Sequence, residues 1–322
     1  MNPAIENDGA LIVAVSRSFA LSLRVLPHPV RGTLSLGYLL ARATDTLADA
    51  GDLPVHDRLH SLDAFADHIA GATSPGLTAL RELTTRAAAS TPHAGERQLL
   101  ERAPELLARL DATPPADRED LRVVLAQIVR GQRLDLSRTA DGRGVLQLTT
   151  AAELTEYADL VAGSVGEFWT RICLRKLPGC TRADPVELAA LGRRFGRGLQ
   201  WVNILRDFPS DASAGRCYLP ADELRAAGSE PDAVRTNPGL ARPVFEHWCR
   251  IAHDALDAGR AYANAMRSRR LRFAVALPCL LGTRTLHSVL AEFPAPGIKI
   301  PRSDLRGLAL QTAIRCAFRH PI

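Results

Sequence analysis

The sequence predicts an all-α protein built as one helical bundle, and three observations support this prediction. Alanine, leucine and arginine, which favour helices, dominate the 322 residues. Alternating runs of β-branched residues bounded by turns, the usual sign of strands, do not occur in the sequence. Proline, glycine and aspartate collect at intervals that divide the chain into helical segments. None of these intervals is long or polar enough for an interdomain linker, so we expect a single domain over residues 1–322.

The helix ends are expected where proline, glycine and aspartate collect. These positions are residues 27–29, 51–54, 73–75, 113–115, 141–144, 178–184, 208–215 and 294–301. The helix before residue 51 and the helix around residue 205 carry the two polar patterns on which the functional prediction depends.

Composition excludes several classes of protein. The apolar fraction of 46% is that of an ordinary globular protein. The net charge is +5, but the 40 basic and 35 acidic residues are interspersed, so we expect no nucleic-acid partner. The mild positive charge favours small anionic ligands.

Cysteine usage and hydropathy predict a cytoplasmic protein. The cysteines show no CxxC spacing, which in a chain of this size indicates reduced, mostly buried thiols. Glu6 and Asp8 stand where a signal peptide would be basic. The longest apolar run, residues 273–282, contains Pro278 and is about half of the roughly 20 residues that a spanning helix needs. We therefore expect no transmembrane segment and at most peripheral membrane contact. The six cysteines are Cys173, Cys180, Cys217, Cys249, Cys279 and Cys316.

A stripe of polar residues lies along one side of the helix around residue 205. Gln200, Asn203, Asp207 and Asp211 are spaced by three, four and four residues, which stacks them on one helix face. Such a stripe is costly to bury unless cations neutralise it. Oxygen ligands without cysteine or histidine suit Mg²⁺, which commonly links carboxylates to substrate phosphates. The stripe predicts half of a metal-diphosphate site.

A second acidic helix supplies the other half of the predicted site. Tyr38, Arg42, Asp45 and Asp49 repeat at four, three and four residues. Arg42 lies one turn before Asp45 on the same face, where a guanidinium can bind phosphate oxygens that the metals leave free. A DxxxD spacing alone is common on solvated helices, so the prediction depends on the pairing of the two stripes.

Both stripes lie within segments that identify a family. These segments are SRSF (16–19), YLLARATDTLAD (38–49), YADLVAGSVGEFW (157–169) and GLQWVNILRDFPSDASAGRCYLP (198–220), with weaker matches in RLRFAVALP (270–278) and GIKI (297–300). In this order they resemble the squalene and phytoene synthases, and most closely the bacterial squalene synthases. The resemblance implies an isoprenoid-synthase helical bundle with a central cavity, in which a prenyltransferase ionises an allylic prenyl diphosphate.

The resemblance also implies roles for individual residues. The Mg²⁺ ligands are Asp45, Asp49, Asn203, Asp207 and Asp211. The diphosphate ligands are Ser16, Arg17, Ser18, Arg42, Gln200, Arg206, Arg216 and Lys299, with a solvated surface lysine as the alternative for Lys299. The pocket walls are Val161, Ala162, Gly163, Val165, Phe168 and Trp201, with Gly163 and Gly166 leaving room for a prenyl chain. The catalytic candidates are Tyr38, Tyr157 and Asp159.

Two positions depart from the family's pattern and leave the acceptor open. Asp159 stands at or beside the position of a tyrosine that the family uses in forming its cyclopropyl intermediate, and Trp201 replaces a smaller residue. The leading prediction is head-to-head coupling of two farnesyl diphosphates to presqualene diphosphate, with NADPH needed only if squalene follows. The alternative is prenyl transfer to an aromatic acceptor such as an indole or carbazole, with Asp159 as the base.

Two hypotheses from other classes are weaker. A catalytically inactive helical scaffold would have no reason to keep five metal ligands and a set of phosphate ligands. A metallohydrolase would depend on His56 and His60 in HDRLH, which loosely resembles the zinc motif HExxH but has Asp in place of Glu. That stretch also fits a polar helix face.

Overall fold

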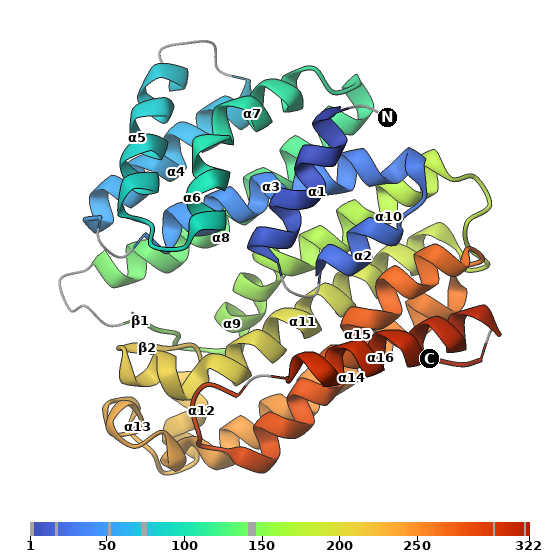
Figure 1. Ribbon diagram of the computed structural model, residues 1–322. Helices are drawn as coiled ribbons and strands as arrows, with labels where there is room; N and C mark the ends of the chain where they lie inside the picture. Colours follow the sequence, from blue (N-terminus) through green and yellow to red (C-terminus); the bar gives the residue numbers. More distant parts are fainter. Residues whose placement is uncertain are drawn as a thin grey trace. The chain divides into compact units, whose positions relative to one another are not determined.

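Helices make up most of the described backbone in the computed structural model, as the sequence predicts (Figure 1). The structure describes residues 3–322 apart from residues 17–18, 51–52, 72–75, 141–145, 299 and 319. The chain forms two compact units. Unit 1 comprises residues 1–140 and 171–178, and unit 2 comprises residues 141–170 and 179–322. The single domain expected over residues 1–322 stays a prediction beside this division.

Unit 1 is organised around one long helix, α3. Its helices are α1 (Pro3–Val15), α2 (Phe19–Val25), α3 (His28–Ala48), α4 (Val55–Ala70), α5 (Gly76–Ser90), α6 (Ala94–Glu101), α7 (Ala103–Asp111) and α8 (Pro115–Ala140). Helix α3 contacts α1, α2, α4, α6, α7 and α8. The apolar face of α3 is fully buried at Leu39, Leu40, Ala43 and Leu47. This leaves the face with Tyr38, Arg42 and Asp45 for polar contacts, as the helical period requires.

A buried carboxylate fixes the end of α10 (Ser164–Lys176) within unit 1. Asp117 of α8 accepts hydrogen bonds of 2.8 Å from Thr33 and from Arg175, and Lys176 also contacts its carboxylate. Burial tends to raise the pKa of Asp117, but the hydrogen bonds from Lys176, Arg175 and Thr33 outweigh it and lower that pKa. The charges of the last turn of α10 are thereby compensated inside unit 1.

Unit 2 is organised around α11. Its elements are β1 (Leu146–Gln147), α9 (Ala151–Ala158), the π-helical turn η1 (Asp159–Gly163), the first half of α10, α11 (Pro185–Ser213), β2 (Arg216–Cys217), α12 (Ala221–Ala226), α13 (Pro231–Thr236), the 3-10 turn η2 (Pro238–Ala241), α14 (Arg242–Ala265), α15 (Arg269–Glu292) and α16 (Arg302–Ala317). Helix α11 contacts α14, α15, α9 and η1, and α16 lies along α15 (Figure 1).

Glycines let α11 come into backbone contact with α10 and with η1. A Cβ atom added to Gly166 would lie 1.9 Å from the carbonyl oxygen of Gly192, and one added to Gly196 would lie 2.2 Å from that of Ala162. The sequence analysis assigned the space at Gly163 and Gly166 to a prenyl chain. That was wrong for these two positions, because Asp159 and Arg197 surround the missing Cβ of Gly163 and α11 occupies the space at Gly166.

One local prediction was confirmed and one was wrong. A helix end was expected at residues 208–215, and α11 continues through Pro209 but ends within this interval, at Ser213. Phe208, which is 1% exposed and packs on Phe245 and Phe293, holds this last turn in the core at the cost of one backbone hydrogen bond. No strand was expected, whereas β1 and β2 form a short parallel pair.

Helix α15 has the length and composition of a membrane span but is partly buried within the fold. By length and composition, α15 could cross a membrane, but half of its most apolar window is buried within the fold. It packs against α11, α14 and α16. The core helix of a soluble protein shows the same combination of length, hydropathy and burial, so the absence of a transmembrane segment stays a prediction. All six cysteines are free and buried, as predicted.

Candidate active site

Arg42 and Asp45, two predicted residues of α3, form a connected ionic group with Glu96 of α6, and we call this group the α3 cluster. Arg42 donates through Nη1 to Asp45 and through Nη2 to Oε1 of Glu96, the latter at 2.6 Å. The side chains of Arg42, Asp45 and Glu96 are 30%, 44% and 26% exposed, so the group is accessible to a ligand. Asp49 follows as the exposed C-cap residue of α3, and its backbone N–H donates to the carbonyl of Asp45.

Burial shifts two titrating groups on this helix. It raises the pKa of Asp45, against the lowering effect of Arg42, and Glu96 adds to the rise. It also raises the pKa of Tyr38, although a hydrogen bond to Ser16 works in the opposite direction. Tyr38 stacks on Phe19 with ring centroids 6.0 Å apart. Ser16 and Tyr38, both predicted site residues, are therefore in contact.

Glu96 belongs to this cluster, and the sequence analysis missed it. It lies 54 residues beyond Arg42, in the first turn of α6, where the side chain of His93 accepts the N–H of Glu96. Gly95 allows this turn to pack closely against α1, since an added Cβ would lie 2.8 Å from the carbonyl oxygen of Ala14. No helical period connects Glu96 with Arg42. The only local signal is an acidic residue in the first turn of a helix, which is common at any helix start.

A second set of predicted residues lies on α11 and on β2 directly after it. We call it the α11 cluster, and its members are Asn203, Arg206, Asp207, Asp211 and Arg216 of β2. Arg206 donates to both carboxylate oxygens of Asp207, at 2.9 and 2.5 Å, and to Oδ1 of Asn203 at 3.1 Å. Arg216 donates to Oδ1 of Asp211 at 2.6 and 3.2 Å. Burial raises the pKa of Asp211 and outweighs the ion pair with Arg216, which lowers that pKa. These hydrogen bonds link Asn203, Arg206 and Asp207 in one group and Asp211 with Arg216 in another.

The donors fit Mg²⁺. All five predicted ligands offer hard oxygens, and Asp45 and Asp207 keep 44% and 48% of their side chains exposed. Three of the four carboxylates, on Asp45, Asp207 and Asp211, contact an arginine that is itself a predicted diphosphate ligand. The group of described residues that already lies at metal-ligand spacing is a different one, His253, Asp254 and Asp257 on the surface of α14.

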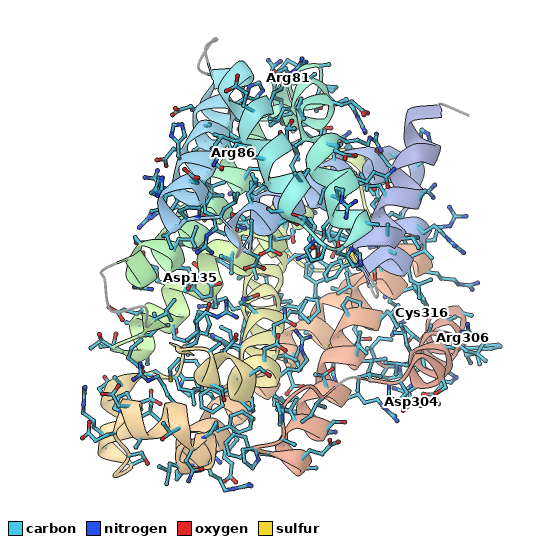
Figure 2. All side chains as sticks on the ribbon, turned by 60° about the vertical axis from the view of Figure 1, so that its left-hand side comes forward. Arg81, Arg86, Asp135, Asp304, Arg306 and Cys316 are labelled. Carbon is cyan, nitrogen blue, oxygen red and sulfur yellow. The ribbon has the colours of Figure 1, made fainter. Side chains whose placement is uncertain are left out.

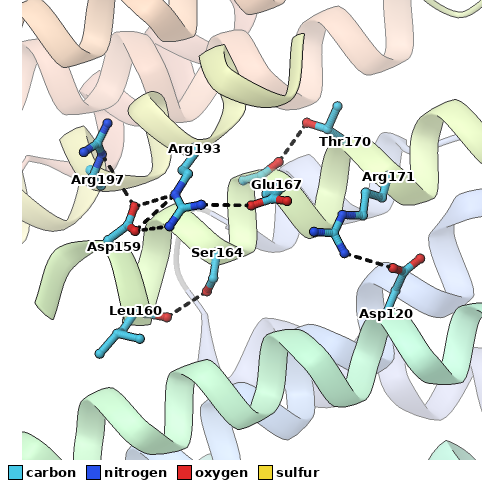
Figure 3. A network of polar contacts seen from close by, with 10 residues as sticks. Asp120, Asp159, Leu160, Ser164, Glu167, Thr170, Arg171, Arg193 and Arg197 are labelled. Carbon is cyan, nitrogen blue, oxygen red and sulfur yellow. Dashed lines mark hydrogen bonds and ion pairs between the residues drawn. The ribbon is translucent and has the colours of Figure 1, made fainter. Parts of the chain in front are cut away.

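Asp159 is held by two arginines of α11 (Figure 3). Arg193 donates to both of its carboxylate oxygens, including distances of 2.9 and 3.1 Å, and Nε of Arg197 lies 3.7 Å from Oδ1. Arg193 also reaches Glu167 at 3.4 Å. The hydrogen bonds of Asp159 raise the pKa of Arg193. Asp159 thus ties the π-helical turn η1 to α11.

The predicted pocket residues of unit 2 lie on η1, α10 and α11. Val161, Ala162 and Val165 are half-buried, whereas Phe168 is 6% exposed. Trp201 is 7% exposed and packs edge-on against Trp248, with ring centroids 5.6 Å apart. The indole N–H of Trp201 is buried without a hydrogen-bond partner among the described residues.

The remaining predicted residues have varied surroundings. Tyr157 is half-buried and stacks on Tyr218 at 5.4 Å. Gln200 is half-buried on α11. Arg17, Ser18 and Lys299 lie outside the described residues. His56, from the metallohydrolase hypothesis, is 80% exposed and pairs with Asp57.

Comparison with known proteins identifies the family of the chain. The sequence profile of the squalene/phytoene synthases matches residues 12–295. The presqualene diphosphate synthase of Rhodopseudomonas palustris is 29% identical over 313 residues, with 94% of this chain and 92% of the relative covered. That of Zymomonas mobilis is 28% identical over 302 residues, with 94% and 88% covered.

A solved structure shares the fold. The complex of TcSQS with the ligand BPH1237 superposes with a TM-score of 0.75 at 21% identity, over 99% of this chain and 91% of that one. The profile spans most of the chain and includes both acidic helices. The chain is therefore a prenyltransferase of the squalene/phytoene synthase family, whose members join prenyl diphosphates head to head.

Proposed function

We propose that the protein couples two farnesyl diphosphates head to head to presqualene diphosphate in a Mg²⁺-dependent reaction. The observation that carries the proposal is the pairing of Asp45, Asp207 and Asp211 with Arg42, Arg206 and Arg216. Each pair unites a carboxylate suited to a metal with a guanidinium suited to a diphosphate. The relatives named presqualene diphosphate synthase support the choice of product.

The ion pairs indicate how the residues act when substrate binds. The guanidinium groups of Arg42, Arg206 and Arg216 turn from their carboxylates to the diphosphate oxygens, where planar bidentate contacts are strong. They stabilise the negative charge that develops on the leaving diphosphate. The carboxylates and Asn203 would hold Mg²⁺, which supplies further charge neutralisation to the leaving group when bound.

The apolar residues protect the allylic cation that forms when the C1–O bond breaks. Val161, Val165 and Phe168 exclude water, which would otherwise capture the cation. The aromatic faces of Tyr38 and Trp201 carry negative electrostatic potential, which stabilises an allylic cation. NADPH is required only if the product is reduced further to squalene. We expect the reaction to take place in the cytoplasm.

Transfer to an aromatic acceptor is the second candidate. It needs Asp159 as a base, but both oxygens of this carboxylate already accept hydrogen bonds from Arg193. That arrangement favours an anchoring role and hence the coupling reaction. One observation supports the aromatic acceptor: the buried indole N–H of Trp201 has no hydrogen-bond partner among the described residues and could donate to a polar acceptor molecule.

A product assay tests the proposal. The purified protein is incubated with Mg²⁺ and farnesyl diphosphate, with and without NADPH, and the extract is analysed by mass spectrometry. Geranyl and dimethylallyl diphosphate serve as donor controls. We expect presqualene diphosphate, detected as its alcohol. If the folded protein binds diphosphate but forms no thirty-carbon product, the coupling proposal is wrong, and indole and carbazole acceptors are tested next.

A further inference from the structure

An apolar stripe follows the outer side of α16. Eight large apolar side chains are exposed among the described residues, and three of them, Leu310, Ile314 and Phe318, succeed one another at steps of four. Their exposed fractions are 65%, 47% and 72%. On the opposite side of the helix, Thr312 and Cys316 are 0% and 2% exposed. The helix therefore has a packed face toward α15 and an apolar face toward solvent.

Basic residues border this stripe. Arg306 lies one turn before Leu310 and extends outward in Figure 2, and Arg315 is exposed beside Ile314. The only acidic residue of α16 is Asp304, which Arg284 of α15 neutralises at 2.6 Å. From residue 305 to residue 322 the sequence contains no acidic residue. The exposed face is thus apolar and cationic.

We propose that this face of α16 binds the surface of an anionic lipid bilayer. Leu310, Ile314 and Phe318 would enter the boundary between headgroups and acyl chains, while Arg306 and Arg315 contact lipid phosphates. The inference does not depend on the reaction that the protein catalyses.

A second copy of the chain fits this face less well. A symmetric contact would bring the same arginines of both copies together without acidic partners. Three large side chains also fall far short of the roughly 20 residues per side that stable interfaces bury. Charge and area both favour the lipid surface.

Vesicle co-sedimentation of the full chain tests the proposal. The vesicles are pure phosphatidylcholine or an equal mixture of phosphatidylcholine and phosphatidylglycerol. The test variant carries Leu310→Ser, Ile314→Ser and Phe318→Ser, and a charge variant carries Arg306→Gln and Arg315→Gln. The control is Val186→Ser, which removes an isolated side chain that is 78% exposed.

We expect the protein to bind the mixed vesicles and not pure phosphatidylcholine. The apolar triple variant should bind at least about 10-fold more weakly, and the charge variant should lose the preference for the mixture. Val186→Ser should bind as the parent chain does. Failure of the parent chain to bind the mixture, or equal binding by the triple variant, overturns the proposal. A dimer in light scattering that the triple variant abolishes would assign the face to a second copy instead. Thermal unfolding of each variant shows that it is folded.

Discussion

Arginine is the counter-ion of three predicted metal ligands in this structure. Arg42, Arg206 and Arg216 each contact a carboxylate that lies one to five residues away. A metal ion that binds alone would compete with these guanidinium groups for their carboxylates, and a diphosphate that binds alone would compete with the carboxylates for their arginines. When both bind, every charge keeps an opposite partner. We therefore expect the two ligands to bind cooperatively.

Removal of one carboxylate tests the metal assignment. Asp45→Ala, Asp49→Ala, Asp207→Ala and Asp211→Ala should each lower product formation by about 100-fold or more, because one ligand to the metal is lost. Circular dichroism should show unchanged helix content. Asp254→Ala, which removes an exposed carboxylate of α14, should keep full activity. Normal turnover by Asp207→Ala would exclude it as a ligand.

Glu96 gives a second prediction, which assumes the proposed substrate. Glu96→Gln removes the charged acceptor that holds Arg42, so the KM for farnesyl diphosphate should rise about 10-fold while kcat changes less. Affinity for inorganic pyrophosphate, measured by calorimetry, should fall in parallel. Glu96→Asp should recover part of the loss.

A matched control separates this positioning role from stability. Glu105 of α7 makes a comparable pair with Arg102 at 2.7 Å, away from the α3 cluster. Glu105→Gln should therefore leave the KM unchanged. If both variants raise it equally, Glu96 has no special effect on Arg42.

The crossing of α10 and α11 sets the position of the α11 cluster within unit 2. Gly166→Ala would place a methyl group 1.9 Å from the carbonyl oxygen of Gly192, so the two backbones must separate. We expect a loss of about 2–4 kcal/mol in the free energy of unfolding. Urea denaturation measures it.

Gly32 provides the control for this substitution. It is exposed on α3, and an added Cβ meets nothing within 4 Å. Gly32→Ala should stabilise the protein by roughly 0.5–1 kcal/mol, because alanine favours the helix. An unchanged free energy of unfolding in Gly166→Ala would show that the two helices can separate without loss of stability.

The link between η1 and α11 distinguishes the two roles of Asp159. If it is an anchor, a double-mutant cycle with Asp159→Asn and Arg193→Gln should give a coupling energy of about 1 kcal/mol, since Arg193 is 45% exposed. Product formation by Asp159→Asn should then stay close to that of the parent. A large loss of rate without a loss of stability would identify Asp159 as the base.

Buried thiols make the folded chain sensitive to alkaline pH. Burial raises the pKa of Cys217 to about 11 and those of Cys249 and Cys279 to about 12. Unfolded thiols ionise near pH 9, so their contribution to stability is complete below that pH. It is lost as the pH rises toward the folded values, by about 1.4 kcal/mol per pH unit for each thiol.

We therefore expect the melting temperature to fall steeply above pH 9, and less steeply in Cys279→Ala than in the parent chain. The folded protein should also react slowly with a thiol reagent, because all six cysteines are buried. Rapid labelling at neutral pH would contradict this picture.

Much of the fold and of the site could be predicted from local patterns. Helical period placed Arg42 with Asp45, and Asn203, Asp207 and Asp211 along one side of α11, since residues three or four apart share a helix face. Proline and glycine predicted helix ends correctly at residues 27–29, 113–115, 178–184 and 208–215, because their effect on the backbone is local. Pro209 does not itself end α11, because burial of Phe208 outweighs the missing hydrogen bond, and the helix ends at Ser213 within the expected interval.

Contacts between distant segments depended on the folded chain. Glu96 meets Arg42 across 54 residues, and Arg193 meets Asp159 across 34. The closeness of Gly166 to Gly192 likewise follows from how two helices cross. Residue types and spacings specify the helices, their polar faces and the family, since these follow from the backbone's own geometry. The partners of Arg42 and Asp159 follow from packing, because long-range contacts form only when many side chains are buried together.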